Sequence, residues 1–242
     1  MAFISSHILI LVLLFAGLMT FLWLLLFRGR LHMTWWAALI ISVLHVFYGV
    51  FCVKFFAILE GSDAGSMSIY GAVFFMPVGY FLAAKLFKRR VADVFDIFAV
   101  PMIFTLLCAR VNCLVSGCCY GLHIGDSPFR WPTRESEMLF YVILLLIVAP
   151  KVKKGGMDGR LYPIYMIAYG IFRGINECFR YSALTDSHFH LSHIWCIVSV
   201  LIGTAILLYM NQQKKKQPVP VAAAEEAPVD PEPSDTPPEQ DE

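Results

Sequence analysis

The sequence predicts an all-α, polytopic membrane protein with about seven transmembrane helices, its N-terminus outside and its C-terminus in the cytoplasm. Of the 242 residues, 58% are apolar and only 15% are charged, too few charges to cover the surface of a soluble domain of this length. Long apolar stretches recur along the chain, and stretches of about 18 residues or more can cross the hydrocarbon layer of a membrane as helices. The basic residues gather in alternate connections between these stretches.

The first apolar stretch, residues 8–27, contains no charged residue. It is longer than the apolar region of a cleavable signal peptide and no basic cluster precedes it, so we expect it to remain as a membrane helix. We predict spans at residues 7–27, 34–59, 67–87, 91–109, 133–148, 161–178 and 191–209, the fifth being the shortest. The second span carries Lys54, the fourth carries Asp93 and Asp96, and the sixth carries Arg173 and Glu177.

The distribution of lysine and arginine predicts the orientation. One side of the predicted membrane domain holds Arg28, Arg30, Lys85, Lys88, Arg89, Arg90, Lys151, Lys153, Lys154, Arg160, Lys214, Lys215 and Lys216. The other side holds only Arg130, Arg134 and Arg180, with Arg110 and Arg173 buried near it. Because cytoplasmic loops carry the excess of basic residues, the first side is expected to be cytoplasmic. This alternation requires an odd number of spans, which agrees with seven.

Two parts are expected along the chain: a seven-helix membrane domain at residues 1–212, and a basic juxtamembrane segment with a cytoplasmic tail at residues 213–242. The tail, residues 217–242, is rich in proline and acidic residues and has no aromatic residue. Such a composition cannot bury a core, so we expect the tail to be disordered. The net charge of +1 gives no reason to expect a nucleic-acid partner.

Seven cysteines are present, and no two of them form a C-x-x-C pair. The sequence therefore predicts neither a zinc site nor a disulfide framework, and no cofactor. Most of the cysteines lie in apolar stretches, where a free cysteine behaves as a small apolar residue. The adjacent Cys118 and Cys119 leave thiol redox chemistry as one alternative function.

Residues 110–121, R-V-N-C-L-V-S-G-C-C-Y-G, form the first of three polar clusters near the predicted outer face. An ionisable residue near the bilayer centre costs at least about 2.5–3.5 kcal/mol, so such residues persist where they pair or line a cavity. The planar donor fork of Arg110 suits a phosphate group, and Gly117 and Gly121 permit a sharp turn. The alternative is an interfacial arginine that reaches lipid headgroups above a tight turn.

The sixth predicted span contains the second cluster. Its polar residues recur every three or four positions, so we expect them on one helical face; they are Tyr162, Tyr165, Tyr169, Arg173, Glu177 and Arg180. The alternative is a buried ion-pair network that serves only packing.

The third cluster is residues 65–71, G-S-M-S-I-Y-G, which places Tyr70 near the outer interface, where tyrosines are also common as interfacial anchors. Arg110, Tyr70 and the Glu177–Arg180 pair come from three separate spans but fall near the same leaflet, which predicts a shared pocket for an anionic lipid headgroup. Asp93 and Asp96 lie at the opposite end, where we expect them to cap or pair.

Three groups of residues, in this order, carry a resemblance to a known family. The first is Asp96, Pro101, Arg110, Gly117 and Gly121; the second is W-P-T-R-E-S-E at residues 131–137; the third is Y-G-x-x-R-x-x-x-E-x-x-R at residues 169–180, which includes Gly170. Over residues 43–209 the chain resembles the prolipoprotein diacylglyceryl transferase family of bacterial inner membranes. That family has G-R-x-G-N-F-x-N-G-E-x-x-G at the first group, H-P-T-Q-x-Y-E at the second, and the third motif in full.

The chain departs from the family at several positions and resembles a divergent G-C-C-Y-G branch of it. Tyr70 stands where the family's S-F-H-G-G element has an essential histidine. Cys113 and Ser116 align with the two asparagines of the family's arginine motif, and Cys118 aligns with its glutamate. Pro132, Thr133 and Glu137 of the second motif are retained.

The resemblance implies transfer of a diacylglyceryl group from phosphatidylglycerol to the lipobox cysteine of a prolipoprotein signal peptide, or a closely related lipid-to-acceptor transfer, in the bacterial inner membrane. It implies catalytic roles for Arg110 and Arg173 on the lipid phosphate, for Glu177 in orienting an arginine, and for Tyr70 as a hydrogen-bonding group. The implied headgroup-binding residues are Arg180, Ser116, Gly117, Cys118, Gly121, Tyr169 and Glu137. The alternative is a non-catalytic protein of the same fold that binds anionic lipid.

Overall fold

The computed structural model describes residues 2–62, 65–180 and 191–216, and these residues form seven α-helices and no β-strand beyond isolated bridges. The helices are α1 (Ala2–Leu26), α2 (Trp35–Leu59), α3 (Tyr70–Leu86), α4 (Val91–Ser116), α5 (Thr133–Lys154), α6 (Leu161–Glu177) and α7 (Leu191–Lys216). The prediction of an all-α fold is confirmed, and each predicted span coincides with one helix. The prediction for the tail, residues 217–242, lies outside the described residues.

Helices α4 and α5 extend past their predicted ends. Helix α4 continues to Ser116, so Arg110 lies within the helix and not at its end. Helix α5, predicted as the shortest, has 22 residues, whereas α3 and α6 have 17 each. In both α4 and α5 the helix stops where a glycine takes a positive φ, at Gly117 and Gly155, because glycine adopts that conformation without steric cost.

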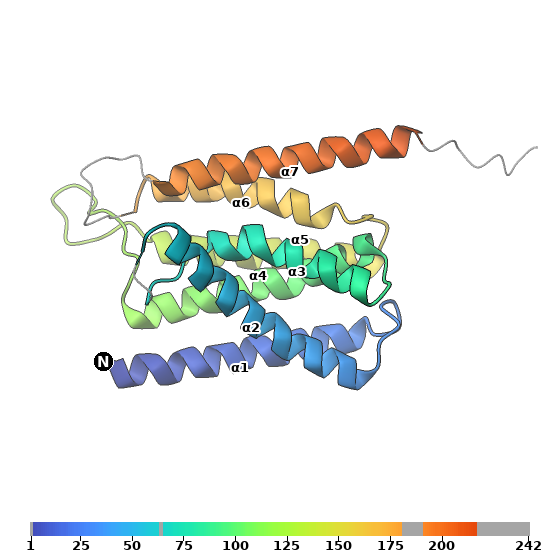
Figure 1. Cartoon of the computed structure of the whole chain (residues 1–242). Coiled ribbons are helices and arrows are strands. Elements are labelled where there is room, and N and C mark those ends of the chain that lie inside the picture. Colours follow the sequence, from blue (N-terminus) through green and yellow to red (C-terminus); the bar gives the residue numbers. More distant parts are fainter. Residues whose placement is uncertain (1, 63–64, 181–190, 217–242) are drawn as a thin grey trace, which may run out of the picture.

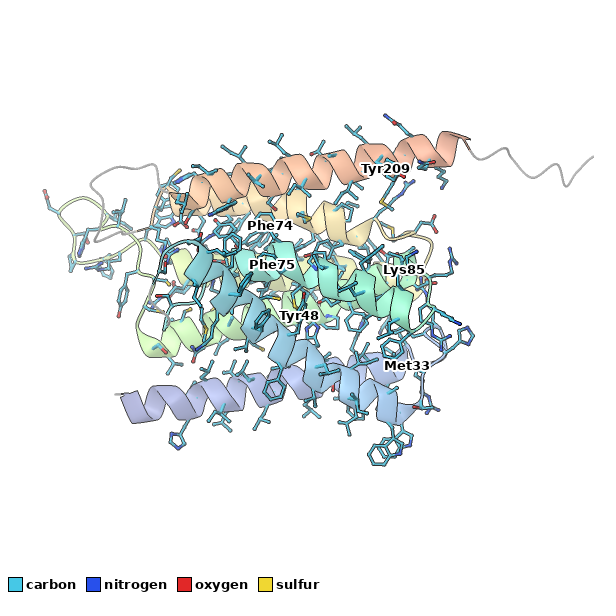
Figure 2. All side chains as sticks on the ribbon, viewed as in Figure 1. Met33, Tyr48, Phe74, Phe75, Lys85 and Tyr209 are labelled. Carbon is cyan, nitrogen blue, oxygen red and sulfur yellow. The ribbon has the colours of Figure 1, made fainter. Side chains whose placement is uncertain are left out.

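The helices lie side by side in a bundle, with α2 running obliquely across it (Figure 1). The N-terminus and the α2–α3 and α4–α5 connections lie at one end, which we call the site end. The α1–α2, α3–α4 and α5–α6 connections lie at the other, which we call the basic end, with Lys85 and Met33 near it in Figure 2. The predicted cytoplasmic residues outside the helices therefore share one end of the bundle.

Four of the helices are long and apolar enough to cross a membrane: His7–Leu26, Trp35–Leu59, Val91–Ser116 and Leu191–Lys214. Helix α3 is apolar but shorter. Helices α5 and α6 fall outside this group because α5 begins and ends with charged residues and α6 carries Arg173 and Glu177 along its 17 residues. The helices thus support a multi-pass membrane protein, while seven crossings and their orientation stay predictions.

Ion pairs and backbone caps hold the basic end together. Asp93 pairs with Arg30 of the α1–α2 connection at 2.6 Å, and Arg30 also donates to the carbonyl of Val152 on α5. Asp96 accepts hydrogen bonds from the backbone N–H groups of Gly159 and Leu161, at 2.9 and 3.2 Å, and so satisfies free donors at the start of α6. The prediction that Asp93 and Asp96 pair or cap at this end is confirmed.

A close approach of α2 and α3 fixes where α3 begins. A side chain at Gly71 would collide with the backbone carbonyl of Cys52, so only glycine permits this spacing. Nearer the middle of the bundle the Tyr48 hydroxyl donates to the carbonyl of Phe75 at 2.9 Å; both residues are labelled in Figure 2. These contacts direct Tyr70, the first residue of α3, into the interior, where it is only 3% exposed.

Candidate functional site

The polar stripe of α6 lies on a single buried face, as predicted. Tyr162, Tyr165, Tyr169, Arg173 and Glu177 are all 3% exposed or less. Helix α6 ends at Glu177, so Arg180 follows the helix and is not part of its face. The stripe brings its charged end to the site end of the bundle.

Glu137 of α5 joins two arginines from separate helices. One carboxylate oxygen lies 2.9 Å from the Arg110 guanidinium of α4, and the other accepts from Arg173 of α6 at 2.8 Å. The Tyr141 hydroxyl, one turn along α5, donates to the same carboxylate at 3.0 Å. The sequence assigned Glu137 to the headgroup-binding group but did not predict this bridging position.

The network continues along α6. The second carboxylate, Glu177, lies 2.6 Å from Arg173 and 3.3 Å from Arg180. We call Arg110, Glu137, Arg173, Glu177 and Arg180 the charge network. Three guanidiniums share two carboxylates, so the network carries one excess positive charge. The Nε–H groups of Arg110 and Arg173 are buried and have no hydrogen-bond partner within the described part of the chain.

A tight turn follows α4 and folds the chain back on the helix. Gly117 adopts a left-handed conformation with φ 62° and ψ 38°, and its N–H and that of Cys118 donate to carbonyls of the last helical turn, the pattern of a glycine C-cap. Cys119 also has a positive φ, of 61°. Two residues of α5 hold this backbone, because Thr133 donates to the Cys119 carbonyl at 3.0 Å and Arg134 to the Cys118 carbonyl at 3.4 Å.

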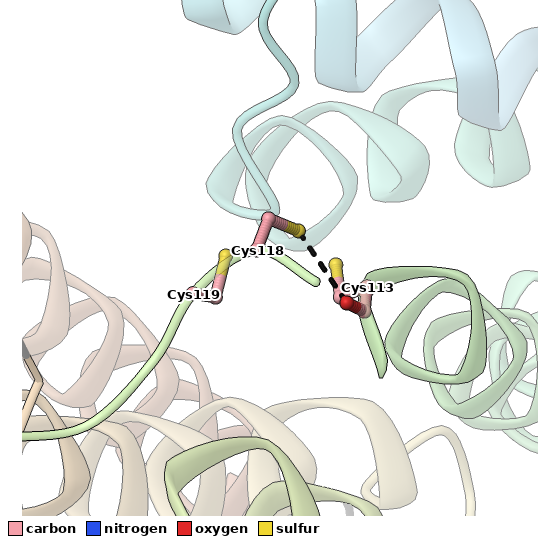
Figure 3. A group of neighbouring side chains, drawn as sticks. All are labelled: Cys113, Cys118 and Cys119. Carbon is pink, nitrogen blue, oxygen red and sulfur yellow. Dashed lines mark hydrogen bonds between the residues drawn. The ribbon is translucent and has the colours of Figure 1, made fainter. Parts of the chain in front are cut away.

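This turn gathers three free thiols. The sulfurs of Cys113, Cys118 and Cys119 all lie within 4.8 Å of one another (Figure 3). Cys118 is exposed, and the other two are half-buried. The absence of a C-x-x-C pair did not predict this cluster, because Cys113 lies in the last turns of the helix and reaches the other two only through the reversal at Gly117.

Arginines contact two of these sulfurs. Arg180 donates to the Cys119 sulfur at 3.2 Å, and Arg110 lies 3.9 Å from that of Cys113. Hydrogen bonds from the Cys113 and Cys118 thiols, and then the charges of Arg180 and Arg110, hold the pKa of the Cys119 thiol well below its usual range. Hydrogen bonds with Cys113 and Cys119 raise the pKa of the Cys118 thiol.

The α4–α5 connection, beyond the turn, is hydrogen-bonded to the segment that follows α6 and so holds Arg180 at the site. The N–H of Leu122 donates to the Phe179 carbonyl at 2.8 Å, and Gly121 and Arg180 form an isolated antiparallel bridge. A side chain at Gly121 would collide with the carbonyl of Trp131, whose ring stacks on Phe179 at 4.3 Å between centroids. Gly121 thus packs the loop and does not line the cavity described below.

Tyr70 lies beside the charge network with its hydroxyl already bonded. The hydroxyl donates to the carbonyl of Ser192 at 3.0 Å and lies 3.2 Å from the sulfur of Cys196, both on α7. Its ring meets that of Tyr169 edge-on at 6.3 Å. Tyr169 is fully buried, and its hydroxyl has no partner among the described residues.

A cavity of about 900 Å³ joins these groups to the apolar surfaces of α1, α2 and α4. Its polar lining includes Arg110, Arg173, Arg180, Tyr70, Ser116, Cys113, Cys118 and Cys119. Apolar residues such as Leu13, Val46 and Met102 line the rest. Of the predicted site residues, Gly117, Gly121, Glu137, Tyr169 and Glu177 lie behind this lining. The cavity therefore has an apolar wall of helices and a polar side with three guanidiniums.

Comparison with known proteins agrees with this geometry. The family model for prolipoprotein diacylglyceryl transferase matches residues 12–209. A Phosphatidylglycerol--prolipoprotein diacylglyceryl transferase of Dehalococcoides mccartyi is 23% identical over 66% of this chain and 66% of its own. Proteins of the same name from Clostridium tetani and Pasteurella multocida are 29% identical over 46% of this chain and 27% identical over 63%.

The matched part spans between about half and two thirds of these relatives, at 51%, 63% and 66% of their lengths. The family model covers most of the helical bundle, from α1 to α7, and includes every residue of the charge network. The resemblance found in the three sequence motifs is thus confirmed, and the chain belongs to the prolipoprotein diacylglyceryl transferase family.

Proposed function

We propose that this protein transfers the diacylglyceryl group of phosphatidylglycerol to the cysteine thiol of a prolipoprotein lipobox, or to a closely related acceptor, at the outer leaflet of a bacterial inner membrane. In this proposal all seven helices cross the membrane and the basic end faces the cytoplasm. The site end then faces outward, where the signal peptide of an exported protein is accessible.

The excess positive charge of the charge network is the observation that carries the proposal. Three guanidiniums share two carboxylates at the polar side of an apolar cavity. Those of Arg110 and Arg173 are buried and paired, as buried charges must be, and the side chain of Arg180 is 29% exposed. A lipid phosphate would supply the missing negative charge and accept from the unpartnered Nε–H groups of Arg110 and Arg173. The acyl chains would lie along the apolar wall formed by α1, α2 and α4.

The reaction requires two things of the site. The acceptor must attack as a thiolate, because the thiol itself is a poor nucleophile. The sulfur then forms a bond to the glyceryl carbon that bears the phosphate ester, and the carbon–oxygen bond breaks with its electron pair going to the leaving glycerol phosphate. Arg110 and Arg173 would stabilise the charge that develops there, with Glu137 and Glu177 fixing their orientation. Arg180 would contact the headgroup.

The test uses purified full-length protein, phosphatidylglycerol and a lipobox peptide, with the peptide weighed by mass spectrometry. We expect a gain of one diacylglyceryl group, which a peptide with serine in place of cysteine does not show. Arg110→Ala and Arg173→Ala should lose the product, whereas Arg28→Ala, an exposed arginine at the basic end, should keep it. An unmodified peptide, when a standard enzyme modifies the same peptide, would refute the transferase proposal.

The state of Tyr70 favours a second candidate, a protein that binds anionic lipid without transferring it. Its hydroxyl is engaged with Ser192 and Cys196 and stands where the family has a histidine base. The second candidate predicts saturable phosphatidylglycerol binding with no product. Tyr70→His should raise turnover if a base at this position is what the chain lacks; unchanged or lower turnover would mean that the acceptor thiol is activated elsewhere.

A further inference from the structure

The thiol cluster has the composition of a metal site. Three thiolate ligands suit Zn²⁺ and other soft cations, and zinc sites that perform chemistry have three protein ligands and leave a fourth position open. A zinc–sulfur distance of about 2.3 Å in tetrahedral geometry puts the sulfurs roughly 3.8 Å apart. The sulfurs of Cys113, Cys118 and Cys119 lie within 4.8 Å of one another, so small side-chain rotations complete the site.

The surroundings of the cluster hold it in place and favour the ligating form. The αL conformation at Gly117 and the contacts of Thr133 and Arg134 with the Cys119 and Cys118 carbonyls fix the backbone between the ligands. Arg180 donates to the Cys119 sulfur and Arg110 lies near that of Cys113. Such outer contacts orient metal ligands and offset the negative charge of three thiolates.

All three cysteines line the 900 Å³ cavity together with the three arginines of the charge network. Within the described residues no histidine or carboxylate joins the three sulfurs as a fourth ligand. An ion held there would therefore face the same space as the proposed phosphate site, with its fourth position free for a ligand that enters the cavity.

We propose that Cys113, Cys118 and Cys119 bind one Zn²⁺, and that the acceptor thiol occupies its fourth position during transfer. The inference rests on the proposed function and deepens it, because it supplies the thiol activation that Tyr70 does not. A thiol that coordinates zinc gives up its proton. That proton passes to solvent, the bound thiolate attacks the glyceryl carbon, and the carbon–oxygen electron pair leaves with glycerol phosphate. No oxidation or reduction takes place.

Metal content tests the site without reference to catalysis. Full-length protein is purified in detergent under reducing conditions, supplied with zinc, and desalted. We expect roughly one zinc ion per chain, as a single site requires, and a drop of about tenfold or more in a Cys113→Ser, Cys118→Ser, Cys119→Ser triple variant. Cys178→Ser is the matched control, because Cys178 is an exposed thiol bonded to Gly174 and His193 instead, and it should bind zinc normally.

If the triple variant does not fold, zinc content is measured in the single variants Cys113→Ser, Cys118→Ser and Cys119→Ser instead. A wild-type protein that binds no zinc after reduction, or a triple variant that binds as much as the wild type, would overturn the site. A disulfide between two of the three cysteines that persists in reductant would overturn it as well, because it removes two ligands.

Cobalt substitution tests the open position. Thiolate-to-cobalt charge-transfer bands should appear in wild-type protein loaded with Co²⁺ and be absent from the triple variant. Adding the lipobox peptide should intensify or shift these bands, and the peptide with serine in place of cysteine should not. If these bands do not change when the cysteine peptide is added, the acceptor thiol does not occupy the fourth position of the metal.

The two proposals fail in different ways. If chelation and the triple variant leave diacylglyceryl transfer at the wild-type rate, the metal inference falls and the transferase proposal stands. If the cobalt spectrum responds to the acceptor thiol but the zinc-loaded protein transfers nothing from any phospholipid, the transferase proposal falls and the metal site stands.

Discussion

The two ends of the bundle use buried charge differently. At the basic end each carboxylate has its own partners: Asp93 pairs with Arg30 and Arg90, and Asp96 accepts from two backbone N–H groups. At the site end three guanidiniums share Glu137 and Glu177.

We interpret the ion pairs at the basic end as contacts that hold the helices together, and the charge network at the site end as a binding site for a ligand. The carboxylate side chain of Asp93 is 17% exposed and that of Glu137 only 1%, so the ion pairs that Glu137 makes with Arg110 and Arg173 are more fully removed from solvent. The four changes below test this contrast, from the largest expected effect to the smallest.

Glu137→Ala should have the largest effect on stability. It leaves the buried guanidiniums of Arg110 and Arg173 without their shared carboxylate, and breaking such a buried pair costs about 3–5 kcal/mol. Asp93→Ala at the basic end should cost about 1 kcal/mol or less, because that pair is partly solvated. Denaturant unfolding in detergent measures both, and equal losses would contradict the contrast between the two ends.

Arg110→Ala and Arg173→Ala should each lower diacylglyceryl transfer per folded molecule by about 10²–10³-fold, the usual effect of removing one donor from a developing charge. Arg110→Lys keeps the charge but loses the planar fork, so it should fall between alanine and the wild type. Arg28→Ala at the basic end is the control. Turnover of Arg110→Ala within a few-fold of the wild type would remove Arg110 from the reaction.

Gly117→Ala should strain the turn by about 1–2 kcal/mol, because a side chain is disfavoured at its positive φ of 62°. The new methyl group would also meet the Tyr120 hydroxyl at 2.8 Å. Gly125→Ala carries the same kind of strain with nothing within 4 Å. A short bifunctional thiol reagent should join Cys113 to Cys118 in the wild type and in Gly125→Ala, and less in Gly117→Ala; equal cross-linking in all three would show that the turn does not set the thiol positions.

Tyr70→Phe should have the smallest effect, a loss of about 1 kcal/mol of stability for one hydrogen bond. Tyr48→Phe, which removes a similar bond from a tyrosine hydroxyl to the Phe75 carbonyl, is the matched control and should lose about as much. Thermal unfolding compares the two. A Tyr70→Phe protein as stable as the wild type would show that the bond to Ser192 contributes nothing.

Much of the fold could be predicted from the sequence because membrane helices are encoded locally. The length of the apolar stretches predicted seven helices at the right places. The three- or four-residue spacing of polar residues along one helix predicted the buried face from Tyr162 to Glu177. The positions of Asp93 and Asp96 at the basic end followed from counting along α4. The end of α4 was predicted too early. The helix continues past Arg110 and stops only at Gly117.

The site depended on contacts between segments that the sequence does not relate. The carboxylate of Glu137 lies 27 and 36 positions from the arginines that it joins, in a segment that reads as the polar start of a helix. The thiol cluster could not be predicted from C-x-x-C spacing, because its three cysteines contain no such pair. The spacing C-x₄-C-C becomes a three-sulfur site only when the chain reverses at a left-handed glycine, a conformation that glycine permits but does not require.

The anchoring of Phe179 to Leu122 has a consequence for how the site opens. The Leu122 amide donates to Phe179 at 2.8 Å across two connections, so its hydrogen can exchange with solvent only when the α4–α5 connection separates from the end of α6. Exchange at this one position therefore reports how often the connection that carries Cys119 separates from the segment that carries Arg180, in the absence of any ligand. A lipid that binds the site should slow that exchange.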